Sequence, residues 1–153
     1  MAASKKKVKM EKVPNDKYIG QGGNPDQFYD QKPSWKFSWC DKEKWSIKEE
    51  NVQKVFWDEI FPHLQNLETQ KWSEILVTSK KYNHSIDTNL LNKVAVDRLE
   101  CLNIEAESLI SLRITGTHRI YGYNIGSVFY IIWVDLDHGD NNLCVCRSHK
   151  KHT

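Results

Sequence analysis

Residues 128–134 read Val-Phe-Tyr-Ile-Ile-Trp-Val, and this stretch decides the class of fold. Its side chains are β-branched or aromatic and none is charged, which is typical of a strand that is buried on both faces. A turn, Asn-Ile-Gly-Ser at 124–127, precedes it, and the polar residues 135–142 follow it. We therefore expect Val128–Val134 to be the central strand of a sheet.

The residues before this strand continue the sheet. From Ser108 onward apolar side chains at 112, 114 and 120 alternate with Arg113 and Arg119, and the alternation is interrupted at 115–117. A period of two indicates strands, and short connections join antiparallel neighbours. We expect antiparallel strands over 108–134. Residues 143–147 are a candidate for one more short strand.

The first part of the chain predicts a strand and then helices. Residues 35–39 alternate aromatic and polar side chains, which favours a half-buried strand with Trp35 and Trp39 on one face, packed on the helices. Ser46 and Glu49 have the spacing of a helix capping box. Helices are predicted at about 47–67 (with Pro62 bending or restarting the helix), at 70–76, and from Asp87 or Thr88 to about 102, with a loop at 78–87. The fold class is α+β, with an N-terminal strand and helices packed on a small antiparallel sheet.

Length and charge limit the organisation and the function. A chain of 153 residues is the size of one domain, and its net charge is only +2. Residues 1–33 hold seven Lys against four acidic residues and few apolar ones, so we expect a flexible basic arm before a domain at 34–153. A uniformly basic nucleic-acid binder is excluded, and any anion site has to be local. Neither a signal peptide nor a spanning segment is predicted, so we expect a cytoplasmic protein with no membrane partner.

Two arginines and a histidine are the candidate catalytic residues. Arg113 and Arg119 are six residues apart, in strands that should be neighbours or continuous, and an even separation places both on one face if the strand is unbroken. Paired guanidiniums bind phosphate in a bidentate manner. His138 follows the apolar strand, can reach the same face, and titrates near neutral pH, which suits proton transfer. The alternative is structural: the arginines cover apolar surface or pair with acids such as Glu105 and Glu107, and the histidine is inert.

These residues resemble a known family. Leu112-Arg113, five further residues, Arg119-Ile120 with tyrosine next, a turn, and an apolar strand that ends near His138 are similar to the RelE/YoeB group of bacterial toxins. The resemblance implies a RelE-like domain of one strand, helices and antiparallel strands, and it implies an mRNA endoribonuclease of a toxin–antitoxin module. It implies that Arg119 contacts the scissile phosphate and that His138 is the general acid.

The resemblance leaves the general base open. Glu105 and Glu107 are candidates only because they precede the arginine-bearing strand in the sequence. The implied partners are RNA, free or on the ribosome, and an antitoxin protein. The rival interpretation is a non-catalytic RelE/ParE-like module that binds nucleic acid or a protein target.

The C-terminal tail, residues 139–153, raises two further questions. It is basic, and Arg147, Lys150 and Lys151 are candidate RNA-binding residues. It also carries Cys144, Cys146, His149 and His152, which are zinc-ligand types. Their spacing is too tight to close a tetrahedron, so we expect no metal, and no cofactor motif is present.

Overall fold

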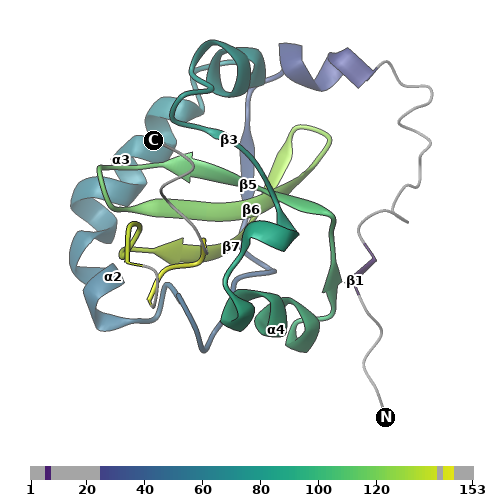
Figure 1. Cartoon of the computed structure of the whole chain (residues 1–153). Helices are drawn as coiled ribbons and strands as arrows, with labels where there is room; N and C mark the ends of the chain where they lie inside the picture. The colour runs from purple at the N-terminus through teal and green to yellow at the C-terminus, as the bar shows by residue number, and fades with distance from the viewer. Residues whose placement is uncertain (1–5, 8–24, 141–142, 147–153) are drawn as a thin grey trace.

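The structure is a computed structural model that describes residues 6–7, 25–140 and 143–146 (Figure 1). The predicted α+β class is confirmed. The elements, in chain order, are β1 (Lys6–Lys7), η2 (Pro25–Asp30), β2 (Ser34–Lys36), α2 (Glu50–Val55), the π-helical turn η3 (Phe56–Ile60), α3 (Phe61–Leu67), the π-helical turn η4 (Glu74–Thr78), β3 (His84–Asp87), η5 (Thr88–Leu90), α4 (Lys93–Cys101), β4 (Ile104–Glu105), β5 (Ser108–Arg113), β6 (Arg119–Ile125) and β7 (Val128–Asp135).

A five-stranded open sheet organises the domain. Its strand order is β2-β7-β6-β5-β3, and all neighbours are antiparallel except β2, which runs parallel to β7. The strands predicted at 108–134 are therefore confirmed, and β7 is an interior strand buried on both faces. The middle position belongs to β6, not to β7 as predicted. A separate two-stranded sheet pairs β1 with β4.

Strand β3 lies inside the segment that was predicted as a loop. Its four residues, His-Ser-Ile-Asp, contain one apolar side chain, so the sequence carries too little alternation to reveal a strand. Backbone pairing with β5 makes it a strand, with Ile86 opposite Leu109 and His84 opposite Ser111. The edge of the sheet thus extends one strand further than the sequence indicates.

A bulge in β7 changes which side chains share a face. Tyr121 of β6 pairs with Trp133, whereas the next residue, Gly122, pairs with Ile131. Ile132 is therefore an extra residue on β7. Because side chains alternate with a period of two, the extra residue moves Trp133 and Asp135 to the face of Tyr121 and Arg119.

Two hydrophobic clusters cover the two faces of the sheet. Helices α2 and α3 run along one side of the sheet and α4 lies on another, as Figure 1 shows. The first cluster joins Leu64, Trp72 and Ile75 to Leu112, Ile120 and Phe129. The second joins Ala95 and Leu99 to Leu109, Tyr121 and Trp133, and it includes the C-terminal Cys144, Val145 and Cys146. None of the described helices has the length and apolar character needed to cross a membrane.

The long helix predicted at 47–67 is three successive helical pieces that begin at Glu50. The backbone N–H of Ser46 donates to the Glu49 carboxylate over 3.4 Å, which is one half of the predicted capping box. Pro62 lies in the first turn of α3, where its missing N–H costs little, so the helix restarts there as expected.

The two helices that follow also differ from their predicted bounds. The helix expected at 70–76 is centred later, on η4. Helix α4 begins at Lys93 with Asn92 as its N-cap, while Asp87 caps the 3-10 turn η5 instead. Val94 is exposed, because a helix that begins at Lys93 places Ala95 and Leu99 on the core side.

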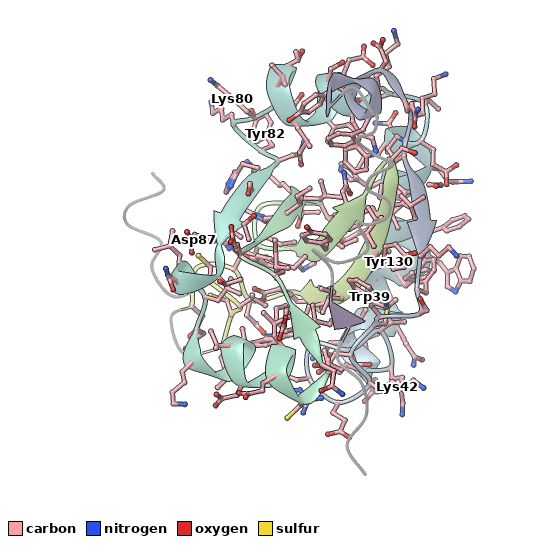
Figure 2. All side chains as sticks on the ribbon, turned by 90° about the vertical axis from the view of Figure 1, so that its right-hand side faces the viewer. Trp39, Lys42, Lys80, Tyr82, Asp87 and Tyr130 are labelled. Carbon is pink, nitrogen blue, oxygen red and sulfur yellow. The ribbon has the colours of Figure 1, made fainter. Side chains whose placement is uncertain are left out.

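The two tryptophans of the N-terminal strand pack on different clusters, which corrects the prediction that they share a face. Strand β2 ends at Lys36, so the alternation does not extend to residue 39. Trp35 lies against Trp72 and Phe129, with ring centroids 6.2 and 5.7 Å apart. The ring centroids of Trp39 and Tyr130 are 4.5 Å apart; Figure 2 labels both residues, and Trp39 also contacts the second cluster.

The segment just before residue 34 contacts the core. Phe28 and Tyr29 are half-buried against the first cluster, and the ring of Phe28 lies 6.0 Å from that of Trp72. The backbone N–H of Trp72 donates to the carbonyl of Gln31 over 2.9 Å. The rest of the predicted arm, residues 1–5 and 8–24, lies outside the described residues.

Gly122 is expected to tolerate no side chain. A Cβ there would lie 2.3 Å from the Tyr130 carbonyl oxygen and 2.6 Å from the Phe129 ring. We expect Gly122→Ala to lower the free energy of unfolding by about 1–3 kcal/mol, because the backbone and a buried ring have to move. Gly116→Ala is the matched control, since its Cβ meets nothing within 4 Å. Urea titrations that show equal stability for the two variants would contradict this packing.

Candidate functional site

The register of the sheet aligns three charged residues in one row. Arg113 at the end of β5 is paired with Arg119 at the start of β6, and Arg119 is paired with Asp135 at the end of β7. Directly paired residues project from the same face. The prediction that the two arginines share a face is therefore confirmed, and of the two arrangements expected, neighbouring strands or one continuous strand, the structure has the first. They meet across a hairpin and do not lie along one unbroken strand.

A pocket of about 280 Å³ opens on this face, and it brings together the three residues predicted as catalytic. Arg113, Arg119 and His138 all line it. The remaining lining residues come from the segment leading into β3, from β3, from the middle of the sheet and from the C-terminal segment: Lys81, Tyr82, His84, Ile86, Ser111, Tyr121 and Cys146.

The Arg119 guanidinium is held by the turn that it follows. Its Nη1 donates to the carbonyl oxygens of Thr115, Gly116 and His118 over 2.7, 3.1 and 3.2 Å. Burial lowers the pKa of Arg119, and Arg113 adds to this effect, while Tyr121 and Asp135 oppose it. An arginine remains charged under such a shift. Its hydrogen bonds within the described chain all use Nη1, so Nε and Nη2 remain for a ligand.

Arg113 is positioned by the segment before β3. Its backbone N–H donates to Asn83 Oδ1 over 3.0 Å, and its guanidinium lies over the Tyr82 ring at 4.9 Å from the ring centroid. Asn83 is buried and donates in turn to the Ile75 carbonyl. Tyr82 lies on the surface near Lys80 in Figure 2, where it can hold the guanidinium by a cation–π contact.

Asp135 anchors the chain that follows β7. It is fully buried, and its two carboxylate oxygens accept the backbone N–H groups of Asp137 and Val145, each over 2.8 Å. The first contact shapes the loop that carries His138, whose backbone N–H donates to the Thr117 carbonyl. The second places the C-terminal segment beside the sheet, so that Cys146 reaches the pocket.

That segment forms less regular structure than its sequence suggested. Residues 143–147 were a candidate strand, but Cys146 makes only an isolated bridge with Leu91. Side chains fix the segment instead, because Trp45 Nε1 donates to the Leu143 carbonyl and Asn92 Nδ2 to the Cys144 carbonyl. Burial raises the pKa of the Cys144 thiol to about 11, so this cysteine is a protonated core residue.

The acidic residues considered as the general base lie elsewhere. Glu105 is in β4 and Glu107 precedes β5, and both border a different hollow with Val96, Leu99 and Tyr123. Arg113 is at the opposite end of β5, about 17 Å away along a strand that rises about 3.4 Å per residue. Both glutamates were named because they are close to Arg113 in the sequence. They lie before the first residue of β5, whereas Arg113 is its last residue, so the length of the strand separates them.

The remaining predicted residues cannot be placed. Arg147, Lys150 and Lys151, named as RNA-binding, and His149 and His152 of the possible zinc cluster lie outside the described residues. In the part of the chain that is described, no group of three or more His, Cys, Asp or Glu side chains is arranged to hold a metal ion.

Sequence reasoning missed His84, Tyr82 and Asp135 as members of the site. His84 and Tyr82 fell in the segment predicted as a loop, and only the pairing of β3 with β5 brings them to the arginines. Asp135 was assigned to a polar exit from the strand, whereas it is the buried last residue of β7. One signal was available for Asp135, because a carboxylate directly after the seven-residue apolar run 128–134 is a candidate for burial with satisfied oxygens.

Asp135 should leave a signature in the pH dependence of stability. Burial raises its pKa from an ordinary 3.8 to about 6, while the N–H groups of Val145 and Asp137 and the charge of Arg119 oppose the shift. The folded protein therefore holds this proton more tightly than the unfolded chain. The stabilisation from protonated Asp135 is complete below about pH 4 and is lost as the pH rises through about 6.

We expect the free energy of unfolding of the wild type to fall by roughly 1–3 kcal/mol from this group between pH 4 and pH 6.5. Asp135→Asn removes the titrating proton and keeps one acceptor oxygen, so its stability should lack this fall, whatever its absolute value. Urea titrations of both proteins across this range measure the difference. Parallel curves for the two proteins would show that Asp135 ionises normally.

Comparison of this chain with protein-family models, with curated proteins and with solved structures found no match. The function is consequently inferred from the geometry of the pocket. Two guanidiniums, two imidazoles and a lysine line it, and the buried carboxylate of Asp135 is paired with Arg119.

Proposed function

We propose that the protein is a metal-independent endoribonuclease whose active site is the Arg113–Arg119–His138 pocket. The observation that carries the proposal is the convergence of two cross-strand guanidiniums and an imidazole on one pocket of about 280 Å³. A pocket of this charge fits a phosphodiester, since planar guanidiniums bind phosphate oxygens in pairs. Proton transfer by His138 adds the element that a simple anion site does not need.

The reaction is an internal transesterification of RNA. The ribose 2′-oxygen loses its proton to a base and attacks the adjacent 3′-phosphorus, and the bond from phosphorus to the 5′-oxygen breaks. Arg119 and Arg113 stabilise the negative charge that builds on the phosphoryl oxygens. His138, as imidazolium, gives its proton to the leaving 5′-oxygen. The products are a 2′,3′-cyclic phosphate and a 5′-hydroxyl.

The resemblance to RelE/YoeB-like toxins supports the same activity. The order of β2, helices and the antiparallel β5, β6 and β7 agrees with the order that the resemblance implies. On this proposal the protein is a cytoplasmic toxin that cleaves mRNA, free or on the ribosome. An antitoxin protein neutralises it by covering the pocket.

A second candidate function is a non-catalytic module that binds nucleic acid or a protein. The observation that favours it is the contact of Arg119 Nη1 with three carbonyls of its own turn, which is what an arginine with a structural role makes. The two candidates make different predictions for cleavage, although both predict binding of anions at the pocket.

Substitution of the site residues separates the two functions. We expect Arg119→Ala to lower the rate of RNA cleavage by at least ~10²-fold, because a fixed guanidinium beside the developing charge is lost. Arg119→Lys tests the same role while it keeps a donor for the turn carbonyls. His138→Ala should lose about 10²–10⁴-fold. Arg113→Ala should cost less, since its guanidinium mainly positions the backbone of the substrate and contributes less than Arg119 to stabilising the transition state.

The assay follows a labelled RNA oligonucleotide with purified protein, with and without ribosomes, and detects cyclic phosphate ends. EDTA should leave the rate unchanged. Lys93→Ala is the control, because Lys93 is exposed on α4 and pairs with Asp97 away from the pocket. Thermal melts show whether each variant is folded. Wild-type protein that binds RNA without cutting it would favour the binding module, and cleavage that persists in both Arg119→Ala and His138→Ala would refute this site.

A further inference from the structure

The pocket has a second imidazole on the side opposite His138. His84 lies on β3, which is the edge strand beside β5, whereas His138 follows β7 on the far side of β6. Arg113 and Arg119 lie on the two strands between them. With strands about 4.8 Å apart, the backbones of β3 and β7 are about 14 Å apart, and both imidazoles line the pocket between them.

The register explains why His84 faces the arginines. His84 is paired with Ser111, which precedes Arg113 by two residues on β5 and therefore projects from the same face. His84 is thus displaced by about 7 Å along the strand from the row of arginines. A side chain at this offset is compatible with reaching a ribose next to a phosphate that the arginines hold.

A backbone carbonyl lies within hydrogen-bond distance of one ring nitrogen of His84. Its Nδ1 lies 3.2 Å from the carbonyl oxygen of Ser85. A carbonyl can only accept, so Nδ1 carries the proton in this contact, and the lone pair of the neutral ring is on Nε2. A neutral imidazole with its lone pair on Nε2 can accept a proton from a substrate hydroxyl.

We propose that His84 is the general base of the reaction and that it acts opposite the general acid His138. This inference rests on the proposed endoribonuclease function and names the residue that the sequence could not supply. In the forward step His84 Nε2 accepts the 2′-hydroxyl proton as the 2′-oxygen bonds to phosphorus. The bond to the 5′-oxygen breaks at the same centre, and His138 delivers a proton to that oxygen. One proton enters the protein and one leaves it, so the step is balanced.

Tyr121, Asp135 and the two glutamates fit the role of general base less well. Burial raises the pKa of Tyr121 strongly, so its phenol stays protonated. The oxygens of Asp135 already accept the N–H groups of Asp137 and Val145. Glu105 and Glu107 border a different hollow.

A substrate with a leaving group that needs no proton tests the assignment. The probes are a uridylyl-3′,5′-adenosine phosphodiester and the corresponding uridine 3′-(p-nitrophenyl phosphate), whose nitrophenolate leaves without an acid. On the dinucleotide, His84→Ala and His138→Ala should each lower kcat/KM by about 10²–10⁴-fold. On the nitrophenyl ester, His138→Ala should recover to within about tenfold of the wild type, while His84→Ala should keep its full loss. Ser85→Ala is the matched control, because its side chain projects from the opposite face of β3 and its carbonyl is retained.

The pH profile supplies an independent readout. Wild-type kcat/KM should be bell-shaped, with a rising limb from loss of the proton on the base and a falling limb from loss of the proton on the acid. His84→Ala should lose the rising limb and keep the falling one. The charged groups that share the pocket with His84 are Lys81, Arg113, Arg119 and His138, and Asp135 is paired with Arg119; all are unchanged in this variant.

The outcomes separate the two proposals. Wild-type protein that cleaves neither probe nor RNA refutes the endoribonuclease function itself. Wild-type cleavage with a His84→Ala variant that is as active as Ser85→Ala refutes His84 as the base and leaves the function standing. Recovery of His84→Ala, and not of His138→Ala, on the nitrophenyl ester would show that the acid and the base are interchanged and would overturn the assignment.

Discussion

The buried carboxylate of Asp41 fixes the bulge on which the pocket depends. Its backbone N–H donates to the carbonyl of Ile132, the extra residue of β7, over 2.9 Å. Its side chain accepts two hydrogen bonds from Arg98 and one from Trp133 Nε1. Burial acts to raise the pKa of Asp41, but these hydrogen bonds and those from the backbone of Glu43 and Lys44 outweigh it and hold the pKa below its ordinary value. A one-residue slip in β7 would turn Trp133 and Asp135 to the other face, and the arginine pair would lose the carboxylate beside it.

The sequence predicts the sheet well where one strand face differs from the other, and poorly where it does not. Strands β5 and β6 were found from the alternation around Arg113 and Arg119, and β7 from its unbroken apolar run. That same run hides the bulge, because Ile131, Ile132 and Trp133 are apolar on either face and no polar residue marks the change of phase. Strand β3 was hidden for the opposite reason, since it has one apolar residue and is a strand because β5 offers it backbone partners.

The candidate site was predicted in part, and the division has a physical cause. Arg113, Arg119 and His138 could be named because they flank strands that the sequence itself reveals. His84 could not, since its place depends on a strand pairing between segments about twenty-five residues apart, which no local pattern encodes. Glu105 was named because it is close to Arg113 in the sequence. A strand has the largest rise per residue of the regular structures, so residues that are close in sequence lie far apart along it.

The electrostatics of the pocket explain why this fold tolerates two facing arginines. Like charges directly opposite on neighbouring strands repel each other. The repulsion is reduced by Asp135 on one side of the row, by the turn carbonyls at Arg119 Nη1, and by the Tyr82 ring under Arg113.

Asp135 is one carboxylate for two guanidiniums, and its raised pKa means that it is partly protonated near pH 6. Phosphate affinity should therefore increase as the pH falls through 6, because the nearest negative charge disappears.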